Sequence, residues 1–155
     1  MGRRHLSRLV LIVIALAVAG SAAAASAIPF RVVAHDIAAT KTSSTPFALV
    51  ATSRISAHRI VVDVPTPAAQ PVLLANYRTS IVLGVFGPFG CKDDRVSVAR
   101  LTQAGSTLTV DLKVKSLPPG TMECQAVYET ARVLVVPRSA LHGVPTKATV
   151  VVAGS

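Results

Sequence analysis

The chain has 155 residues, a formal net charge of +9, two cysteines, and a composition that is 51% hydrophobic and 4% aromatic. This length suits one domain with a core of its own and argues against a multidomain protein. The basic residues after residue 27 are scattered singly and are not interleaved with aromatic residues, which argues against a nucleic-acid surface with a basic stripe or a stacking platform.

The first residues have the three parts of a secretory signal peptide. Residues 3–8 hold three arginines, residues 9–19 are uncharged and apolar, and residues 25–27 (Ala-Ser-Ala) supply a small-x-small cleavage site. We therefore predict that residues 1–27 are a signal peptide that is removed, and that residues 28–155 form a single secreted or otherwise extracytoplasmic domain. The removed segment carries three bases and no acid, so the formal charge falls from +9 to +6.

Two other interpretations of this segment stay open. The apolar stretch from Leu9 to Ile28 is about 20 residues long, the length that spans a bilayer, so an uncleaved segment (residues 9–28) would anchor the protein in the membrane. Its second half is mostly Ala and Ser, which drives insertion only weakly. The Arg3-Arg4 pair also resembles part of a twin-arginine export signal.

The first half of the remaining chain contains three predicted strands and one predicted helix or turn. Residues 30–35 and 47–53 are short apolar-rich runs and are expected to be strands. Residues 59–64 (RIVVDV) are rich in β-branched side chains and predict a third strand, closed by a turn at residues 65–67 (PTP). Residues 68–78 are expected to hold one short helix or turn, interrupted by a proline.

Strand patterns dominate the second half. Residues 80–86 (SIVLGVF) are nearly all apolar, which predicts a central strand covered on both faces. Residues 95–101 and 106–115 carry alternating apolar side chains on either side of a short Gly-containing link, which predicts a β-hairpin. Residues 131–136 (ARVLVV) predict another buried strand that a proline ends, and residues 148–152 predict one more.

The pattern as a whole predicts an all-β fold. No stretch after residue 30 keeps a helical apolar spacing over three turns, and ten prolines punctuate the chain. About seven short strands with turns at regular intervals are typical of a single small antiparallel β-sandwich or a partly open barrel.

The two cysteines, Cys91 and Cys124, flank the predicted hairpin. An even cysteine count in an exported protein favours a disulfide, and closing a loop of about 30 residues would add roughly 3–4 kcal/mol of stability in a chain-entropy model. The alternative is that Cys91 is a nucleophile. The adjacent acids Asp93 and Asp94 argue against it, because they would raise the pKa of the thiol.

Other chemical motifs are weak. His35, His58 and His142 show no metal-ligand spacing, and Asp93 and Asp94 fit a solvated turn better than a calcium loop. The serines lie in no nucleophile-elbow pattern and the glycines in no phosphate-binding loop. We therefore expect no metal and no cofactor.

The segment from Ser80 to Arg138 has a recognisable order of features. An apolar strand ending in Gly (IVLGVFG) leads into a Pro/Gly turn (GPFGC) and an alternating hairpin (RVSVARLTQAGSTLTVDLKVK), and a Pro-rich turn (SLPPGTMECQAVYE) precedes a closing strand (ARVLVVPRS). This order resembles the C-terminal domain of the protease-complex protein PrcB, a small β domain of exported bacterial proteins. The resemblance implies a β core over residues 80–138 and a binding module without catalysis. Arg138 stands where Lys is usual in that family.

These observations favour an exported, non-enzymatic domain that binds another exported protein or a cell-envelope component, such as a protease-associated module or inhibitor. The loops around the disulfide would form a rim, with Phe89 and Met122 as candidate apolar contacts, because binding sites usually lie on loops that a rigid sheet holds. The alternative is a small extracytoplasmic hydrolase or metal-dependent enzyme that uses the histidines with Asp93 or Asp94.

Overall fold

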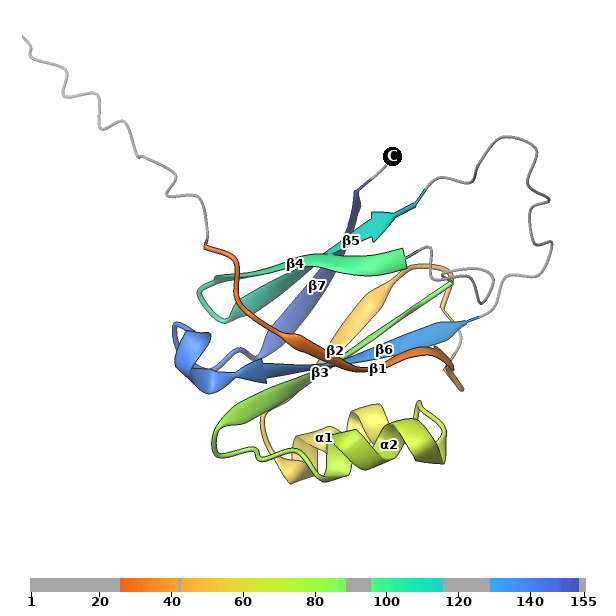
Figure 1. Ribbon diagram of the computed structural model, residues 1–155, viewed down its shortest axis with the longest axis horizontal. Helices are drawn as coiled ribbons and strands as arrows, with labels where there is room; N and C mark the ends of the chain where they lie inside the picture. The colour runs from red at the N-terminus through yellow and green to blue at the C-terminus, as the bar shows by residue number, and fades with distance from the viewer. Residues whose placement is uncertain (1–25, 42, 89–95, 116–128, 154–155) are drawn as a thin grey trace, which may run out of the picture.

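The computed structural model describes residues 26–41, 43–88, 96–115 and 129–153 of the chain. These residues form seven β-strands in two sheets, two α-helices and one short 3-10 helix. The sheets pack face to face, and the helices lie on the outer face of the larger sheet (Figure 1). The predicted all-β sandwich is therefore confirmed, and a helical layer is added to it.

The larger sheet has four antiparallel strands. Their order across the sheet is β1 (Arg31–Ala38), β6 (Thr130–Pro137), β3 (Ser80–Gly87) and β2 (Phe47–Ala51). All four coincide with the apolar runs that predicted them. The two central strands, β6 and β3, pair along their whole length and are covered on both faces, which explains why their sequences are apolar almost without a break.

The smaller sheet has three strands, in the order β4 (Val96–Ala104), β5 (Thr107–Val114) and β7 (Lys147–Ala153). The predicted hairpin is confirmed: β4 and β5 are antiparallel, and Gly105 in the two-residue turn has a φ of 57°, which glycine adopts at little cost. β7 pairs with β5 in parallel, so this pair departs from the antiparallel pairing of the other described strands. The reason is that the chain reaches β7 from β6 in the other sheet, which supplies the crossover that a parallel pair needs.

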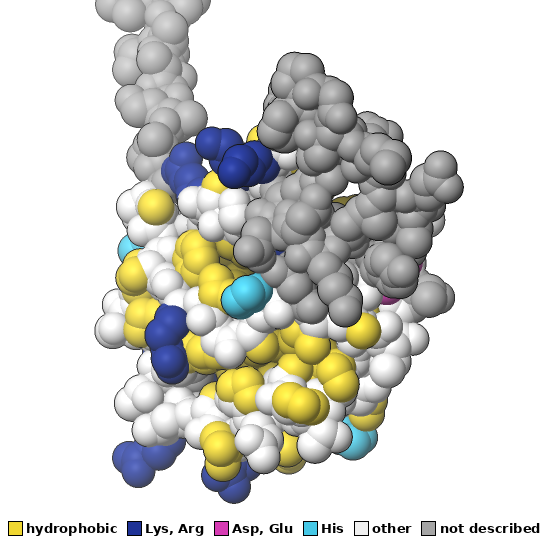
Figure 2. All heavy atoms as spheres, turned by 45° about the vertical axis from the view of Figure 1, so that its right-hand side comes forward, with side chains coloured by type: hydrophobic (Ala, Val, Ile, Leu, Met, Phe, Trp, Pro, Cys, Tyr) yellow, Lys and Arg dark blue, Asp and Glu magenta, His cyan; other side chains and the backbone are white. Residues whose placement is uncertain are grey.

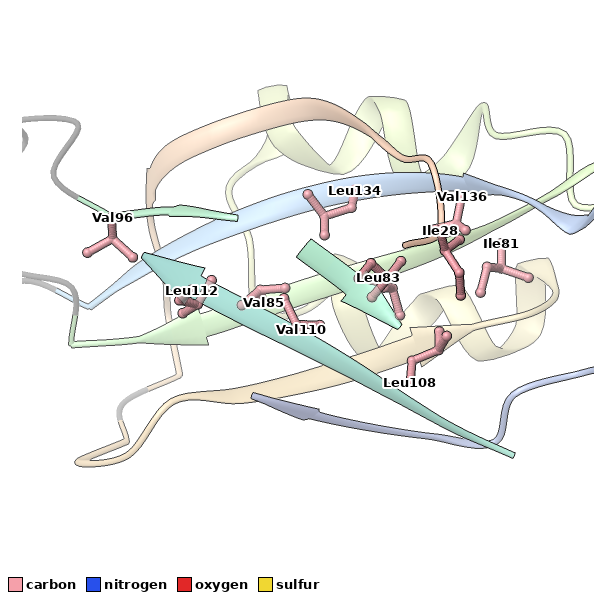
Figure 3. Packing of buried hydrophobic residues seen from close by; sticks show 11 residues of the cluster. Ile28, Ile81, Leu83, Val85, Val96, Leu108, Val110, Leu112, Leu134 and Val136 are labelled. Carbon is pink, nitrogen blue, oxygen red and sulfur yellow. The ribbon is translucent and has the colours of Figure 1, made fainter. Parts of the chain in front are cut away.

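The main core lies between the two sheets. Alternate residues of β5 (Leu108, Val110 and Leu112) are fully buried, as their period of two predicted. From the larger sheet they meet side chains of β3 and β6 that point to the same side, namely Ile81, Leu83, Val85, Leu134 and Val136 (Figure 3).

The sandwich is held at one seam by the segment that precedes β1. The side chain of Ile28 is 5% exposed and belongs to the main core, and its N–H donates a hydrogen bond to the carbonyl of Leu101 in β4 at 2.7 Å. At the other seam β2 and β7 lie beside each other but belong to different sheets. Over the described residues, the sandwich is therefore not closed into a barrel.

Two eight-residue helices, α1 (Arg54–Val61) and α2 (Thr66–Leu73), cover the outer face of the larger sheet (Figure 1). A second core cluster fixes them there, because buried side chains of both helices pack on β3 and β6. Its main members are Ala57, Ile60, Ala68, Val72, Val82, Phe86 and Val133.

The predicted strand at residues 59–64 is wrong, because its first half belongs to α1 and its second half to the turn that follows. Ser53 caps the helix: its hydroxyl accepts a hydrogen bond from Ser56 N at 3.2 Å, while Ser56 Oγ accepts one from Ser53 N at 2.9 Å. Helical spacing then places Ile60 in the core and leaves Val62 54% exposed. The cap and the packing on the sheet together outweigh the β propensity of the run.

The predicted turn at residues 65–67 is the start of α2. Pro65 is the N-cap, and Pro67 lies in the first turn, where a helix does not need the N–H that proline lacks. The expectation of a short helix or turn within residues 68–78 is correct in kind, although the helix already begins at Thr66 and includes Pro71.

Among the residues that the structure describes, no helix has the length and hydrophobicity needed to cross a membrane. Residues 1–25, which hold nearly all of the predicted signal peptide, lie outside the described residues. Cleavage and anchoring therefore both stay predictions.

Candidate binding cleft

The predicted disulfide and rim lie outside the described residues. Cys91 and Phe89 fall in the segment 89–95, and Cys124 and Met122 fall in the segment 116–128. The strand ends that border these two segments lie together at one end of the sandwich (Figure 1). The Cys91–Cys124 disulfide and the binding rim stay predictions, without support from the structure.

The sandwich core becomes polar at that same end. Within β6, Thr130 is 6% and Arg132 is 4% exposed. Both alternate with residues whose side chains face the helices, so they point to the opposite side of the sheet, toward the sandwich core. Arg132 makes at least one interaction with its surroundings. A buried charge of this kind needs compensation by polar or charged groups. The apolar run predicted at residues 131–136 therefore contains one buried cation.

The histidines of the alternative enzyme hypothesis are not brought together. His35 lies on β1, His58 on α1, and His142 between the 3-10 helix and β7, and all three are exposed. No group of three His, Cys, Asp or Glu side chains that could hold a metal ion occurs within the described residues. Asp93 and Asp94 lie outside them.

A cleft that the sequence patterns did not predict lies between the two ends of the helical layer. Its volume is about 520 Å³, and it is lined by residues 52–54, where β2 leads into α1, and by residues 74–78, which connect α2 to β3. Two of its lining residues are arginines, Arg54 and Arg78, and both are exposed. No acidic residue lies among the described residues that line it.

Arg138 holds the two walls of the cleft together. This residue begins the 3-10 helix (Arg138–Ala140), and its side chain is partly buried. Its Nε donates a hydrogen bond to the carbonyl of Tyr77 at 3.0 Å, and its Nη2 donates one to the carbonyl of Thr52 at 2.6 Å. Its backbone N–H also donates to Thr79 O at 2.8 Å. Because the guanidinium presents several donors in one plane, a single side chain can bridge two separate chain segments.

The wall between α2 and β3 is also fixed from within. Asn76 closes a turn by accepting a hydrogen bond from Arg78 N at 3.1 Å, and its carbonyl accepts one from Ser80 N at 2.9 Å. The Tyr77 hydroxyl donates to the carbonyl of Val72 in α2 at 2.8 Å. Burial raises the pKa of Tyr77 above its usual value, while the positive charge of Arg54 opposes this shift. The cleft is therefore preorganised, and Arg54 is close enough to Tyr77 for its charge to act there.

A second hollow of about 540 Å³ adjoins the first and shares residues 74–76 with it. Its lining combines apolar side chains (Val32 and Val33 of β1, Pro71 of α2 and Val135 of β6) with the polar residues Arg31, Asn76 and Ser80. Leu74 lines both hollows and is 79% exposed. Figure 2 shows the face turned toward the right-hand side of Figure 1, where hydrophobic side chains gather in the centre and lower half and Lys and Arg side chains lie at the upper, left and lower margins.

Sequence reasoning missed this cleft because its walls lie some twenty residues apart and carry no motif. Two signals were present in the chain. Ser53 and Ser56 had the spacing of a helix cap, which would have located the start of α1. Arg138 was noted only through a family resemblance, and its contacts with Thr52 and Tyr77 became visible only in the fold. Comparison with protein-family models, curated proteins and solved structures found no match.

Proposed function

We propose that residues 28–155 form an exported, non-enzymatic domain that binds another exported protein or a cell-envelope component. The observation that carries this proposal is the cleft braced by Arg138, with two exposed arginines on its lining and an exposed leucine at its edge. Binding sites of this kind combine a concave surface with a few placed polar groups.

Preorganisation supports a binding role for the cleft. Binding loses affinity when loops must become ordered in the complex. Here the bonds from Arg138 and Tyr77 already hold both walls in place. The resemblance to the PrcB C-terminal domain points the same way, because it implies a module that binds and does not catalyse.

The proposal can be tested by affinity capture with the exported protein as bait. The cleft variant carries Arg54→Glu and Arg78→Glu, and a matched control carries Lys113→Glu in β5 and Lys115→Glu just after it. All four positions are exposed, so both variants should fold and both change the charge equally. We expect wild type and control to retain the same partner from culture fluid or envelope extract, and the cleft variant to lose it.

Equal retention by all three proteins would remove the cleft from the proposal, and retention of nothing by wild type would contradict the binding function itself. Circular dichroism of each variant verifies the fold. The alternative enzymatic function has its own test: the combined His35→Ala, His58→Ala and His142→Ala variant should keep both its fold and its partner.

A further inference from the structure

The two hollows share the lining residues Leu74, Ala75 and Asn76, so they lie next to each other, and together they are called the groove. The groove passes between the start of α1 and the connection from α2 to β3, and then over β1. Arg54 and Arg78 lie along its first part and Arg31 lies along its second part, all of them exposed. No described acid forms an ion pair with any of the three.

We propose that this groove binds an extended segment of a partner protein in which carboxylate side chains flank one apolar side chain. The inference rests on the proposed function and adds the chemistry of the partner. The arginines would bind the carboxylates, and the exposed apolar side chains of Val32 and Leu74 would contact the apolar side chain.

Charge complementarity identifies the flanking groups. Arginine presents a planar fork of donors that matches a carboxylate, and an arginine that makes no ion pair with the acids of the described residues can offer these donors to a ligand. The N-terminus of α1 is not taken as a further anion site, because the hydroxyl of Ser53 already accepts a hydrogen bond from the N–H of Ser56 there. Recognition of the carboxylates therefore depends on the side chains of the three arginines.

The second hollow identifies the apolar group. Val32, which is 42% exposed, lies on its lining together with Val33, Pro71 and Val135, and Leu74, which is 79% exposed, lines both hollows. An anionic wall polymer would satisfy the arginines but would leave the exposed side chains of Val32 and Leu74 in water. An acidic segment with one large apolar side chain satisfies both, and the burial of that side chain would favour binding.

The braced walls favour an extended partner over a folded one. The bonds of Arg138 to Thr52 and Tyr77 join the two sides of the first hollow, so the hollow is not expected to widen when a ligand enters. Arg138 is a positioning residue in this scheme, because its side chain is partly buried and bonds to backbone carbonyls.

The test uses a fluorescent octapeptide in which two glutamates precede and two follow a single leucine. Fluorescence anisotropy measures its binding to the exported protein at low ionic strength. We expect binding that weakens as salt is added, and a loss of about tenfold or more in affinity when lysines replace the glutamates or when serine replaces the leucine.

Variants locate the binding on the groove. Arg54→Glu combined with Arg78→Glu should lower the affinity for the octapeptide by at least about tenfold. Leu74→Ser should abolish the preference for the leucine peptide over the serine peptide. The Lys113→Glu, Lys115→Glu control should bind as wild type does. Leu74 is exposed, so its substitution leaves the fold intact.

Three results would overturn the inference: equal affinity for the acidic and the basic peptide, full affinity in the Arg54→Glu, Arg78→Glu variant, or binding of inorganic polyphosphate in place of the peptide. Affinity capture separates this failure from that of the proposed function. If capture from extract depends on the cleft while the octapeptide does not bind, only the chemistry assigned to the partner is wrong. If the protein captures no partner from extract and does not bind the octapeptide, the proposed function is wrong as well.

Discussion

Gly84 in the middle of β3 is the position at which one added methyl group tests the packing of the helical layer. A Cβ at this residue would lie 2.7 Å from Cε2 of Phe86 and 3.0 Å from Cγ2 of Ile60 in α1. Both neighbours are fully buried, so neither can move into solvent. Overpacking of this kind costs about 1–3 kcal/mol, and the lower entropy of the unfolded chain offsets about 0.4–1 kcal/mol of that cost. We expect Gly84→Ala to lower the free energy of unfolding by about 1–2 kcal/mol.

Urea unfolding followed by circular dichroism measures this change as a lower midpoint at unchanged slope. Combining the substitution with Ile60→Ala should relieve one of the two contacts, so the double variant should lose less stability than the two single variants together, by about 0.5 kcal/mol or more. The control is Gly105→Ala, which meets nothing within 4 Å and lies in an exposed turn at φ +57°. The loss of stability caused by Gly105→Ala should simply add to the loss caused by Ile60→Ala.

A Gly84→Ala protein as stable as wild type would refute the reasoning. So would strict additivity between Gly84→Ala and Ile60→Ala. Either result would mean that α1 does not rest on β3 at this point, and the walls of the cleft would then lose their support, because α1 carries one of them.

Three further predictions concern the remaining features. Burial raises the pKa of Tyr77 above its usual 10.0, so the stability that its neutral form contributes is present below pH 10.0 and is lost as the pH rises through the raised pKa. Tyr77→Phe should therefore reduce the loss of stability at alkaline pH, measured by urea unfolding. Arg54→Gln should raise the pKa of Tyr77 further, measured by an absorbance titration. Non-reducing peptide mapping should link Cys91 to Cys124, and two alkylatable thiols would contradict the disulfide. Intact mass should show an exported chain that begins near Ile28, and a full-length mass would instead indicate the anchor.

The strands were predictable from the sequence because their signals are local. Leu108, Val110 and Leu112 alternate with polar residues, and a strand with one buried face requires that pattern. The apolar run of β3 similarly predicts burial of both faces of the strand, but it does not predict that helices bury one of them. The run at residues 59–64 misled for the same reason: β-branched composition is a local signal, whereas the burial of Ile60 against Phe86 is a tertiary one.

The candidate cleft was not predictable, because it is made of contacts between distant segments. Thr52 and Tyr77 meet through Arg138, which follows them by 86 and 61 residues. No motif marks these positions, and two of the three contribute backbone carbonyls, which every residue has. Only the pairing of β3 with β6 brings Arg138 beside the connection from α2 to β3, since Ser80 lies opposite Pro137.

The sequence by itself determined the strand content, the hairpin and the alternation of the sandwich core, because burial of one or both faces of a strand leaves a period that short stretches retain. It also led us to expect an exported domain. The tertiary structure alone decided that β7 runs parallel to β5, that residues 54–61 are helical, and that three arginines lie along one groove. Each of these depends on which surfaces meet after the chain has crossed from one sheet to the other, and no local pattern records that.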